Sequence, residues 1–174
     1  LVMQMPRGNL EGIRPRCVVL DRVAAACAAR DYAAAFALVR KHRVNYNVLR
    51  DMDFAQLLAD VPRLLDAGIP AETLSAFLLS LDDAALPPPY SFYVAPGDAA
   101  QRTRELVAAV RAEVAARGYP RAHVTTFLAT HLLDAPVDFP AVLAALFAFD
   151  DAAREAGIAY LGSFHPVNAL FREA

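Results

Sequence analysis

Four histidines are the first side chains to consider for chemistry: His42, His123, His131 and His165. A zinc site needs three or four ligands, commonly with a pair three or four positions apart on one helix. His123 and His131 are eight residues apart and have no cysteine beside them. His131 and Asp134 would share a helical face, but one pair does not make a site. We therefore predict structural or surface histidines and no metal site.

The two cysteines, Cys17 and Cys27, fall in one predicted helix. Ten residues of helix separate Cα atoms by about 15 Å, well beyond the limit of about 7 Å for a disulfide. Free cysteines of this kind behave as small apolar side chains in a reducing compartment. We predict that both thiols are buried and unreactive.

The sequence contains no catalytic motif. A glycine-rich phosphate loop, a GxSxG elbow, an HExxH pair and a CxxC cluster are all missing from it. The acidic pairs Asp82–Asp83 and Asp150–Asp151 are expected at helix ends or on solvated faces. Without a nucleophile and an activating base, the chain is predicted to be no enzyme and to need no cofactor.

The densest basic run consists of Arg40, Lys41, His42 and Arg43. It falls at the end of a predicted helix, where cations interact favourably with the helix dipole. Contact with an acidic partner or with an RNA backbone is the competing interpretation. The sequence leaves both open.

Composition limits the class of protein. The chain has 174 residues, of which 57% are hydrophobic, and a net charge of −2. This length suits one domain or a piece of a longer chain, and the missing initiator methionine favours a piece. The apolar fraction excludes a disordered tail. Sixteen of the 17 cations are arginine, as in a GC-rich genome, so their abundance is weak evidence for a nucleic-acid module.

Charge and hydropathy vary along the chain. Residues 1–50 carry a net charge of +6, residues 51–100 carry −7, and the remainder carries −1. Such polarity suits complementary helix faces or a surface for charged partners. No apolar stretch approaches the roughly 20 residues of a membrane span, and no secretory signal precedes residue 15.

Helix signals recur from Pro15 onward. Apolar residues at helical spacing include Cys17, Leu20, Ala24 and Cys27 in the first helix. The sequence also predicts buried stripes for the helices near residues 106–114 and 124–132, and a last helix from Val167. Three aspartates are placed as N-caps, namely Asp31, Asp98 and Asp138, and Asp53 precedes a further short helix.

Breaks separate these helices. Gly68–Pro70 and Gly118–Pro120 give stop and start signals. Residues 86–97 are proline-rich and are predicted to be a stiff, extended surface connector. The best strand candidate, Tyr90–Val94, is short and flanked by proline. The predicted class is all-α, built from antiparallel helical hairpins of a TPR-like α-solenoid without a consensus repeat. A closed bundle is the alternative.

The opening residues and a later stretch resemble one known family. Residues 1–11 read LVMQMPRGNLE, and residues 36–47 read FALVRKHRVNYN, followed in register by residues 48–51. They are similar to the largest Elongator subunit, the elongator complex protein 1 (IKAP) family, where the second stretch resembles EAF…RKLRINLNLIYDH. Weaker similarity continues at residues 107–114, 159–161 and 167–171.

This resemblance implies a domain organisation. Residues 1–14 would form a junction from the end of a β-propeller, and residues 15–174 would begin a helical solenoid that continues beyond this chain. The junction residues that carry the resemblance are Met5, Pro6, Arg7, Gly8, Asn9, Leu10 and Glu11.

The resemblance also implies a function and partners. The family's large subunit is a non-catalytic scaffold for 5-carboxymethyl-type modification of the tRNA wobble uridine. Its partners would be the other Elongator subunits, chiefly the catalytic radical-SAM/acetyltransferase subunit and the propeller subunit. A C-terminal region outside this chain would form a homodimer, and the complex would work in the cytoplasm and also in the nucleus. An unrelated α-solenoid adaptor of vesicle-coat type is the alternative.

Overall fold

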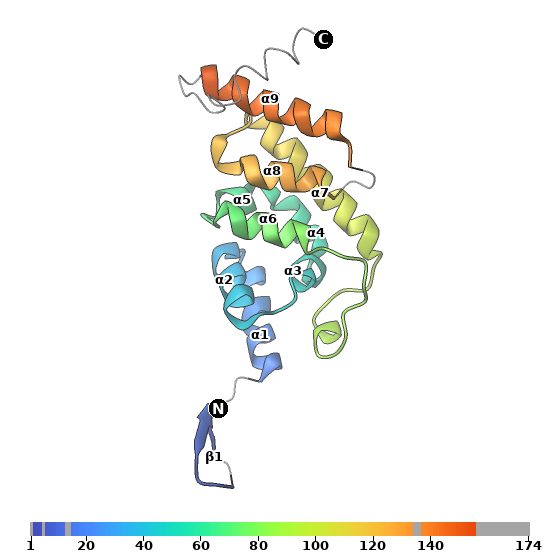
Figure 1. Cartoon of the computed structure of the whole chain (residues 1–174). Helices are drawn as coiled ribbons and strands as arrows, with labels where there is room; N and C mark the ends of the chain where they lie inside the picture. The colour runs from blue at the N-terminus through green and yellow to red at the C-terminus, as the bar shows by residue number, and fades with distance from the viewer. Residues whose placement is uncertain (1, 5, 13–14, 134–136, 156–174) are drawn as a thin grey trace. The chain divides into compact units, whose positions relative to one another are not determined.

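The computed structural model describes residues 2–4, 6–12, 15–133 and 137–155 (Figure 1). Most of this part of the chain is helical, which confirms the predicted fold class. The helices are α1 (Arg16–Ala28), α2 (Tyr32–His42), α3 (Asn47–Met52), α4 (Phe54–Ala59), α5 (Val61–Asp66), α6 (Ala71–Leu79), α7 (Ala99–Ala116), α8 (Val124–His131) and α9 (Phe139–Glu155). Two 3-10 helices, η1 (Tyr90–Phe92) and η2 (Arg121–His123), and two strands, β1 (Val2–Gln4) and β2 (Leu10–Gly12), complete it. No helix in the described ranges has the length and apolarity to cross a membrane.

The chain divides into two compact units. The first unit comprises Leu1–Ile69 and Ser80–Glu105, and the second comprises Pro70–Leu79 and Leu106–Ala174. The sequence analysis did not predict this division. The expected boundary between residues 14 and 15 stays a prediction.

The first unit begins with a β-hairpin that the sequence did not predict. β1 and β2 pair antiparallel, with Val2 opposite Gly12 and Gln4 opposite Leu10. Gly8 has φ +85° in the intervening turn, a conformation that glycine adopts without strain. Strands of three residues are too short to show the alternation on which strand prediction depends.

Helices α1 and α2 form a hairpin in the first unit. Asp31 caps α2 by accepting a hydrogen bond from the Ala34 amide at 3.0 Å, as predicted. Leu20 and Cys27 are buried on α1, but Cys17 is exposed, so the prediction that both thiols are buried is wrong for Cys17. Periodicity identifies the inner face of a helix but not whether a neighbour covers its first turn.

The other predicted caps are confirmed. Asp53, which was expected only to precede a short helix, also acts as a cap: it accepts a hydrogen bond from the Gln56 amide at 3.0 Å and begins α4. Asp98 accepts from the Gln101 amide at 3.0 Å, and Asp138 accepts from the Ala141 amide at 3.1 Å. Side-chain capping is a local interaction, so sequence spacing is enough to predict it.

The proline-rich connector crosses the surface of the first unit, as expected, but its middle is not extended. Residues 90–92 form η1, with the Tyr90 amide donating to the Pro87 carbonyl at 2.9 Å. The weak strand candidate at Tyr90–Val94 therefore forms no strand, in agreement with the all-α prediction, whereas the stiff extended form predicted for the connector is wrong here. The prolines leave few backbone donors for a strand ladder, and the turn satisfies those that follow.

The second unit is built on α6, α8 and α9. α8 packs against α6, which is distant in sequence, and also against α9 (Figure 1). The rings of Tyr119, Phe127 and Phe149 meet edge to face, with centroids 5.3–5.5 Å apart. Such edge-to-face contacts add to the stability that comes from burial.

The two buried apolar faces predicted for helices of the second unit are confirmed to different extents. Leu106, Val110 and Val114 are buried along α7, as expected. On α8, Phe127 is buried but Leu132 is 54% exposed, because α8 ends at His131 and Leu132 is its C-cap. The helix predicted from Val167 lies outside the described residues.

Candidate functional site

The predicted junction residues form the turn of the β-hairpin. Pro6, Arg7, Gly8 and Asn9 are exposed between β1 and β2. Met5 lies outside the described residues, and Leu10 and Glu11 fall in β2. A tight turn accounts for the proline and the glycine without a binding role.

The predicted basic run ends α2. Arg40, Lys41 and His42 occupy its last turn, which confirms the expected position at the negative end of the helix dipole. Arg43 is the C-cap with φ 50°, and the next amide, of Val44, donates to the Val39 carbonyl at 3.0 Å. These bonds satisfy the end of the helix and direct the chain away from it.

Arg16 connects this turn to two other elements. Its guanidinium donates from Nη1 to the His42 carbonyl at 2.7 Å. The guanidinium carbon lies 5.9 Å from the centre of the Tyr90 ring, in cation–π range. The first turn of α1, the last turn of α2 and η1 therefore meet.

Tyr93, which follows η1, holds the connector against α1. Its hydroxyl donates to Asp21 Oδ1 at 2.7 Å and lies 3.2 Å from the Cys17 carbonyl. The hydrogen bond to the Asp21 carboxylate is the main cause that raises the pKa of Tyr93 to about 12. Beside these contacts, Phe92 is 78% exposed and Val18 is 51% exposed.

A buried polar network lies at the centre of the first unit. Arg50, on α3, is fully buried and binds the Asp51 carboxylate through Nε at 2.8 Å and Nη2 at 2.7 Å. Its Nη1 donates to the Asp82 carbonyl at 2.8 Å and to Thr103 Oγ1 at 2.7 Å. Arg50 therefore ties α3 to the segment that precedes the connector and to α7.

Two further side chains extend this network. Asn47 donates to Asp82 Oδ1 at 3.1 Å and accepts from the Asp82 amide at 3.2 Å. Arg102 pairs with Asp51 Oδ1 at 3.1 Å and donates to the carbonyls of Ala95 at 3.0 Å and Pro96 at 2.7 Å. Asp82, four residues before the connector, and residues 95–96 near its end are therefore fixed to one buried ion cluster.

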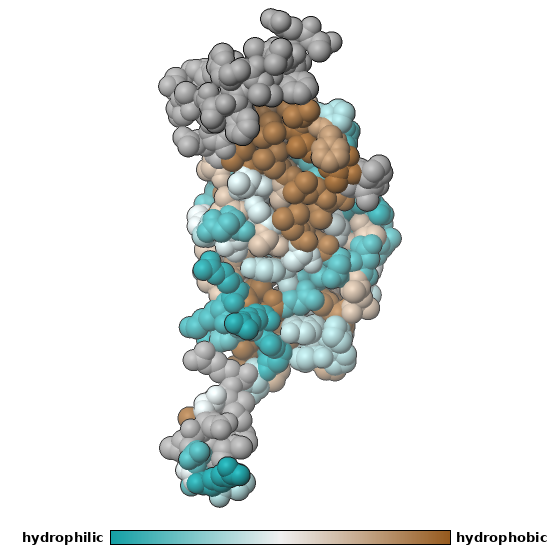
Figure 2. Space-filling view, in the orientation of Figure 1, coloured by the Kyte–Doolittle hydropathy of each residue, from teal (hydrophilic) through white to brown (hydrophobic). Residues whose placement is uncertain are grey.

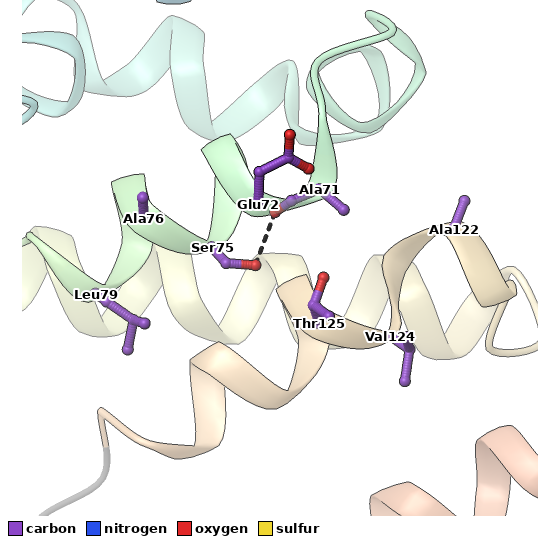
Figure 3. A pocket seen from close by; sticks show the side chains of 8 residues that line it. All are labelled: Ala71, Glu72, Ser75, Ala76, Leu79, Ala122, Val124 and Thr125. Carbon is purple, nitrogen blue, oxygen red and sulfur yellow. Dashed lines mark hydrogen bonds between the residues drawn. The ribbon is translucent and has the colours of Figure 1, made fainter. Parts of the chain in front are cut away.

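The second unit contains a shallow groove between α6 and α8 with a volume of about 620 Å³ (Figure 3). Its walls are small or apolar apart from Glu72 and two hydroxyls. The residues that line it are Ala71, Glu72, Ser75, Ala76, Leu79, Ala122, Val124 and Thr125. The Ser75 hydroxyl already donates to the Ala71 carbonyl at 2.7 Å. The groove thus offers apolar contact and no catalytic pair.

The histidines are not brought together into a site. The His131 ring packs against Phe127 with centroids 5.1 Å apart, and His123 precedes α8. In the part of the chain that the structure describes, no three potential ligands are close enough to hold a metal ion. His165 lies outside that part.

The family comparison decides what kind of helical array this is. The model of the ELP1 alpha-solenoid matches residues 16–155, which include every helix from α1 to α9. The chain belongs to the ELP1 alpha-solenoid family. The resemblance inferred from the sequence is confirmed, and so is the predicted solenoid, whereas the closed bundle is not supported.

Curated relatives agree with this ELP1 alpha-solenoid assignment. Elongator complex protein 1 of Schizosaccharomyces pombe is 43% identical over 81 residues, 47% of this chain and 6% of the relative. The protein of the same name from Drosophila melanogaster is 35% identical over 83 residues, 48% of this chain and 7% of the relative. This chain therefore spans only a small part of these relatives. No solved structure matches it.

The structure shows which elements of this ELP1 alpha-solenoid chain contain the stretch that resembles the family. Residues 36–51 extend from α2 through α3, so they include both the basic turn and the Arg50–Asp51 pair. Sequence reasoning singled out the first and missed the second. The available signal was an arginine that directly follows Val48 and Leu49 and precedes an acid in a short helix.

Proposed function

We propose that this chain is a scaffold segment of the largest subunit of the Elongator complex. The observation that carries the proposal is the ELP1 alpha-solenoid match over residues 16–155. The relatives named Elongator complex protein 1 support it. The buried charged side chains of this helical array bind one another, as is expected of a segment whose role is to hold other subunits in place.

The scaffold would support modification of the tRNA wobble uridine by organising the catalytic subunit. The S-adenosylmethionine, iron–sulfur and acetyl-CoA chemistry would belong to that subunit, and this segment would contribute no catalytic residue. The fully buried Arg50 fits such a division of labour, because its guanidinium is engaged inside the fold.

The proposed partners are the other Elongator subunits. The catalytic radical-SAM/acetyltransferase subunit and the propeller subunit are the chief ones, and dimerisation would use a C-terminal region of the subunit. Arg40, Lys41 and Arg43 are exposed, so the basic turn is available to a partner or to RNA. The proposed location is the cytoplasm, with the nucleus as a second site.

Affinity purification tests membership of the complex. The full-length protein, tagged and expressed at its natural level, is expected to recover the catalytic and propeller subunits in near-stoichiometric amounts. A tagged soluble protein of similar abundance serves as the control. Recovery of neither subunit would overturn the proposal.

Quantifying wobble-uridine modification separates the scaffold from an unrelated adaptor. Deleting the gene is expected to remove the 5-carboxymethyl-type nucleosides from bulk tRNA, and re-expression is expected to restore them. An unrelated α-solenoid adaptor, for example of vesicle-coat type, would leave these nucleosides unchanged.

A further inference from the structure

Three elements of the first unit meet around Arg16, and exposed charged and apolar side chains flank these contacts. Arg16 joins the first turn of α1 to the end of α2 at 2.7 Å and to Tyr90 of η1 at 5.9 Å. Tyr93 adds a hydrogen bond of 2.7 Å to Asp21 of α1. We call these exposed side chains the cationic–apolar surface: Arg40, Lys41 and Arg43 at the end of α2, with Val18 and Phe92.

The cations of the cationic–apolar surface are uncompensated. Arg40, Lys41 and Arg43 are exposed, and among the described residues none of them pairs with a carboxylate. Figure 2 shows hydrophilic side chains gathered over α1 and α2. A helix end carries only about half an elementary charge, so it offsets a fraction of this positive charge. A ligand with carboxylates would therefore be attracted here.

The apolar members are unusually open. Phe92 is 78% exposed and Val18 is 51% exposed, although both flank well-anchored residues. Tyr93, next to Phe92, is fixed to Asp21 and to the Cys17 carbonyl, so the backbone that carries Phe92 is anchored against α1. An exposed aromatic side chain on an anchored backbone segment is a suitable contact for the apolar part of a protein ligand.

We propose that the cationic–apolar surface binds an acidic protein segment that carries apolar side chains. Its carboxylates would meet Arg40, Lys41 and Arg43, and an aliphatic side chain would cover Phe92 and Val18. This goes beyond the scaffold assignment, because the surface can be tested whichever complex the chain joins.

The structure favours a peptide over single-stranded RNA. Proteins that bind single strands stack successive bases on several free aromatic faces. Here the Tyr90 ring faces the Arg16 guanidinium, and the Tyr93 hydroxyl is bound to Asp21, which leaves Phe92 as the open ring. The Asp21 carboxylate repels phosphate, which RNA carries at every nucleotide, whereas a peptide can place an apolar group there.

Fluorescence anisotropy with defined probes tests the proposal on the full chain. The probes are a labelled 12-residue peptide of Glu-Glu-Leu repeats, the same peptide with serine for leucine, and oligouridylate. We expect the leucine peptide to bind most tightly. Arg40→Glu should weaken it about fivefold and Phe92→Ala about tenfold. Arg40→Gln removes the positive charge without adding a negative one, so it should weaken binding less than Arg40→Glu does.

Arg63→Glu is the matched control, because Arg63 is also an exposed arginine in the last turn of a helix, α5. It should leave the affinity for the leucine peptide unchanged. The proposal is overturned if the leucine peptide does not bind, if Arg63→Glu weakens it as much as Arg40→Glu, or if oligouridylate binds more tightly than either peptide.

Discussion

At the scale of single residues, the most unusual feature is a guanidinium with no solvent exposure. Arg50 is tolerated in the core because its donors reach the Asp51 carboxylate, the Asp82 carbonyl and the Thr103 hydroxyl. Such an ion pair contributes little net stability compared with an apolar core, but losing one member leaves the other charge buried and unpaired.

Asp51→Asn tests that argument. The substitution removes the carboxylate that pairs with both Arg50 and Arg102, so we expect the free energy of unfolding to fall by about 3–5 kcal/mol. Asp83→Asn, at an exposed position just before the connector, should change it by less than about 0.5 kcal/mol. Urea denaturation measures both, and equal effects would contradict a buried ion cluster.

Gly97→Ala tests the close approach of Arg102 to the connector. A Cβ at Gly97 would collide with the guanidinium of Arg102, which would have to leave the carbonyls of Ala95 and Pro96. We expect a loss of about 1–3 kcal/mol, as for hydrogen bonds to a charged group. In the Arg102→Ala background the same substitution should cost almost nothing, and a full additive cost would contradict the mechanism.

Cys27 predicts a pH dependence. Burial, with a smaller contribution from Asp53, raises the pKa of its thiol to about 11. The unfolded thiol ionises near pH 8.5–9, so between that pH and about 11 the folded state binds more protons and loses stability as pH rises. The stability advantage of the wild type over Cys27→Ala should shrink across this window by up to about 3 kcal/mol. Denaturation at pH 8, 9.5 and 11 measures it, and a constant difference would contradict the prediction.

At the scale of elements, signals within a few residues predict where a helix begins, whereas contacts between more distant residues are not visible in the sequence. The N-caps follow from spacing alone, and Asp31 begins α2 where the sequence places it. η1 forms within the connector that was predicted to be extended, because the Pro87 and Pro89 carbonyls accept hydrogen bonds from the following amides. A strand would also need a partner for its ladder, which flanking prolines disfavour.

Asp31→Ala measures what the cap contributes to α2. The Ala34 amide would lose its acceptor, so the free energy of unfolding should fall by about 1 kcal/mol. Asp31→Ser keeps a capping oxygen and should restore most of that loss. If serine and alanine are equally destabilising, the cap is not the cause.

At the scale of the whole molecule, the division into two compact units predicts which helices are destabilised by a substitution in one of them. Every side chain of the Arg50 network belongs to the first unit. Amide exchange should therefore rise more in α1, α2 and α3 than in α8 and α9 when Asp51 is replaced by asparagine. Hydrogen-exchange mass spectrometry measures this, and a uniform rise would show one cooperative unit instead.

The sequence by itself determined the helical class, most helix boundaries and the family. Caps, glycine stops and apolar spacing act within a few residues, so they are visible in a linear string. It did not determine the exposure of Cys17 and Leu132, because burial depends on which distant element covers the end of a helix.

Only the tertiary structure decided how the chemically notable residues are used. The basic turn was visible in the sequence, but only the structure shows that Arg16 contacts both the His42 carbonyl, 26 positions away, and the Tyr90 ring of η1, 74 positions away. Likewise Arg50 meets Thr103 across 53 positions of sequence. Hydrogen bonds and ion pairs need atoms within about 3 Å, and for these residues it is the packing of the helices that brings them so close.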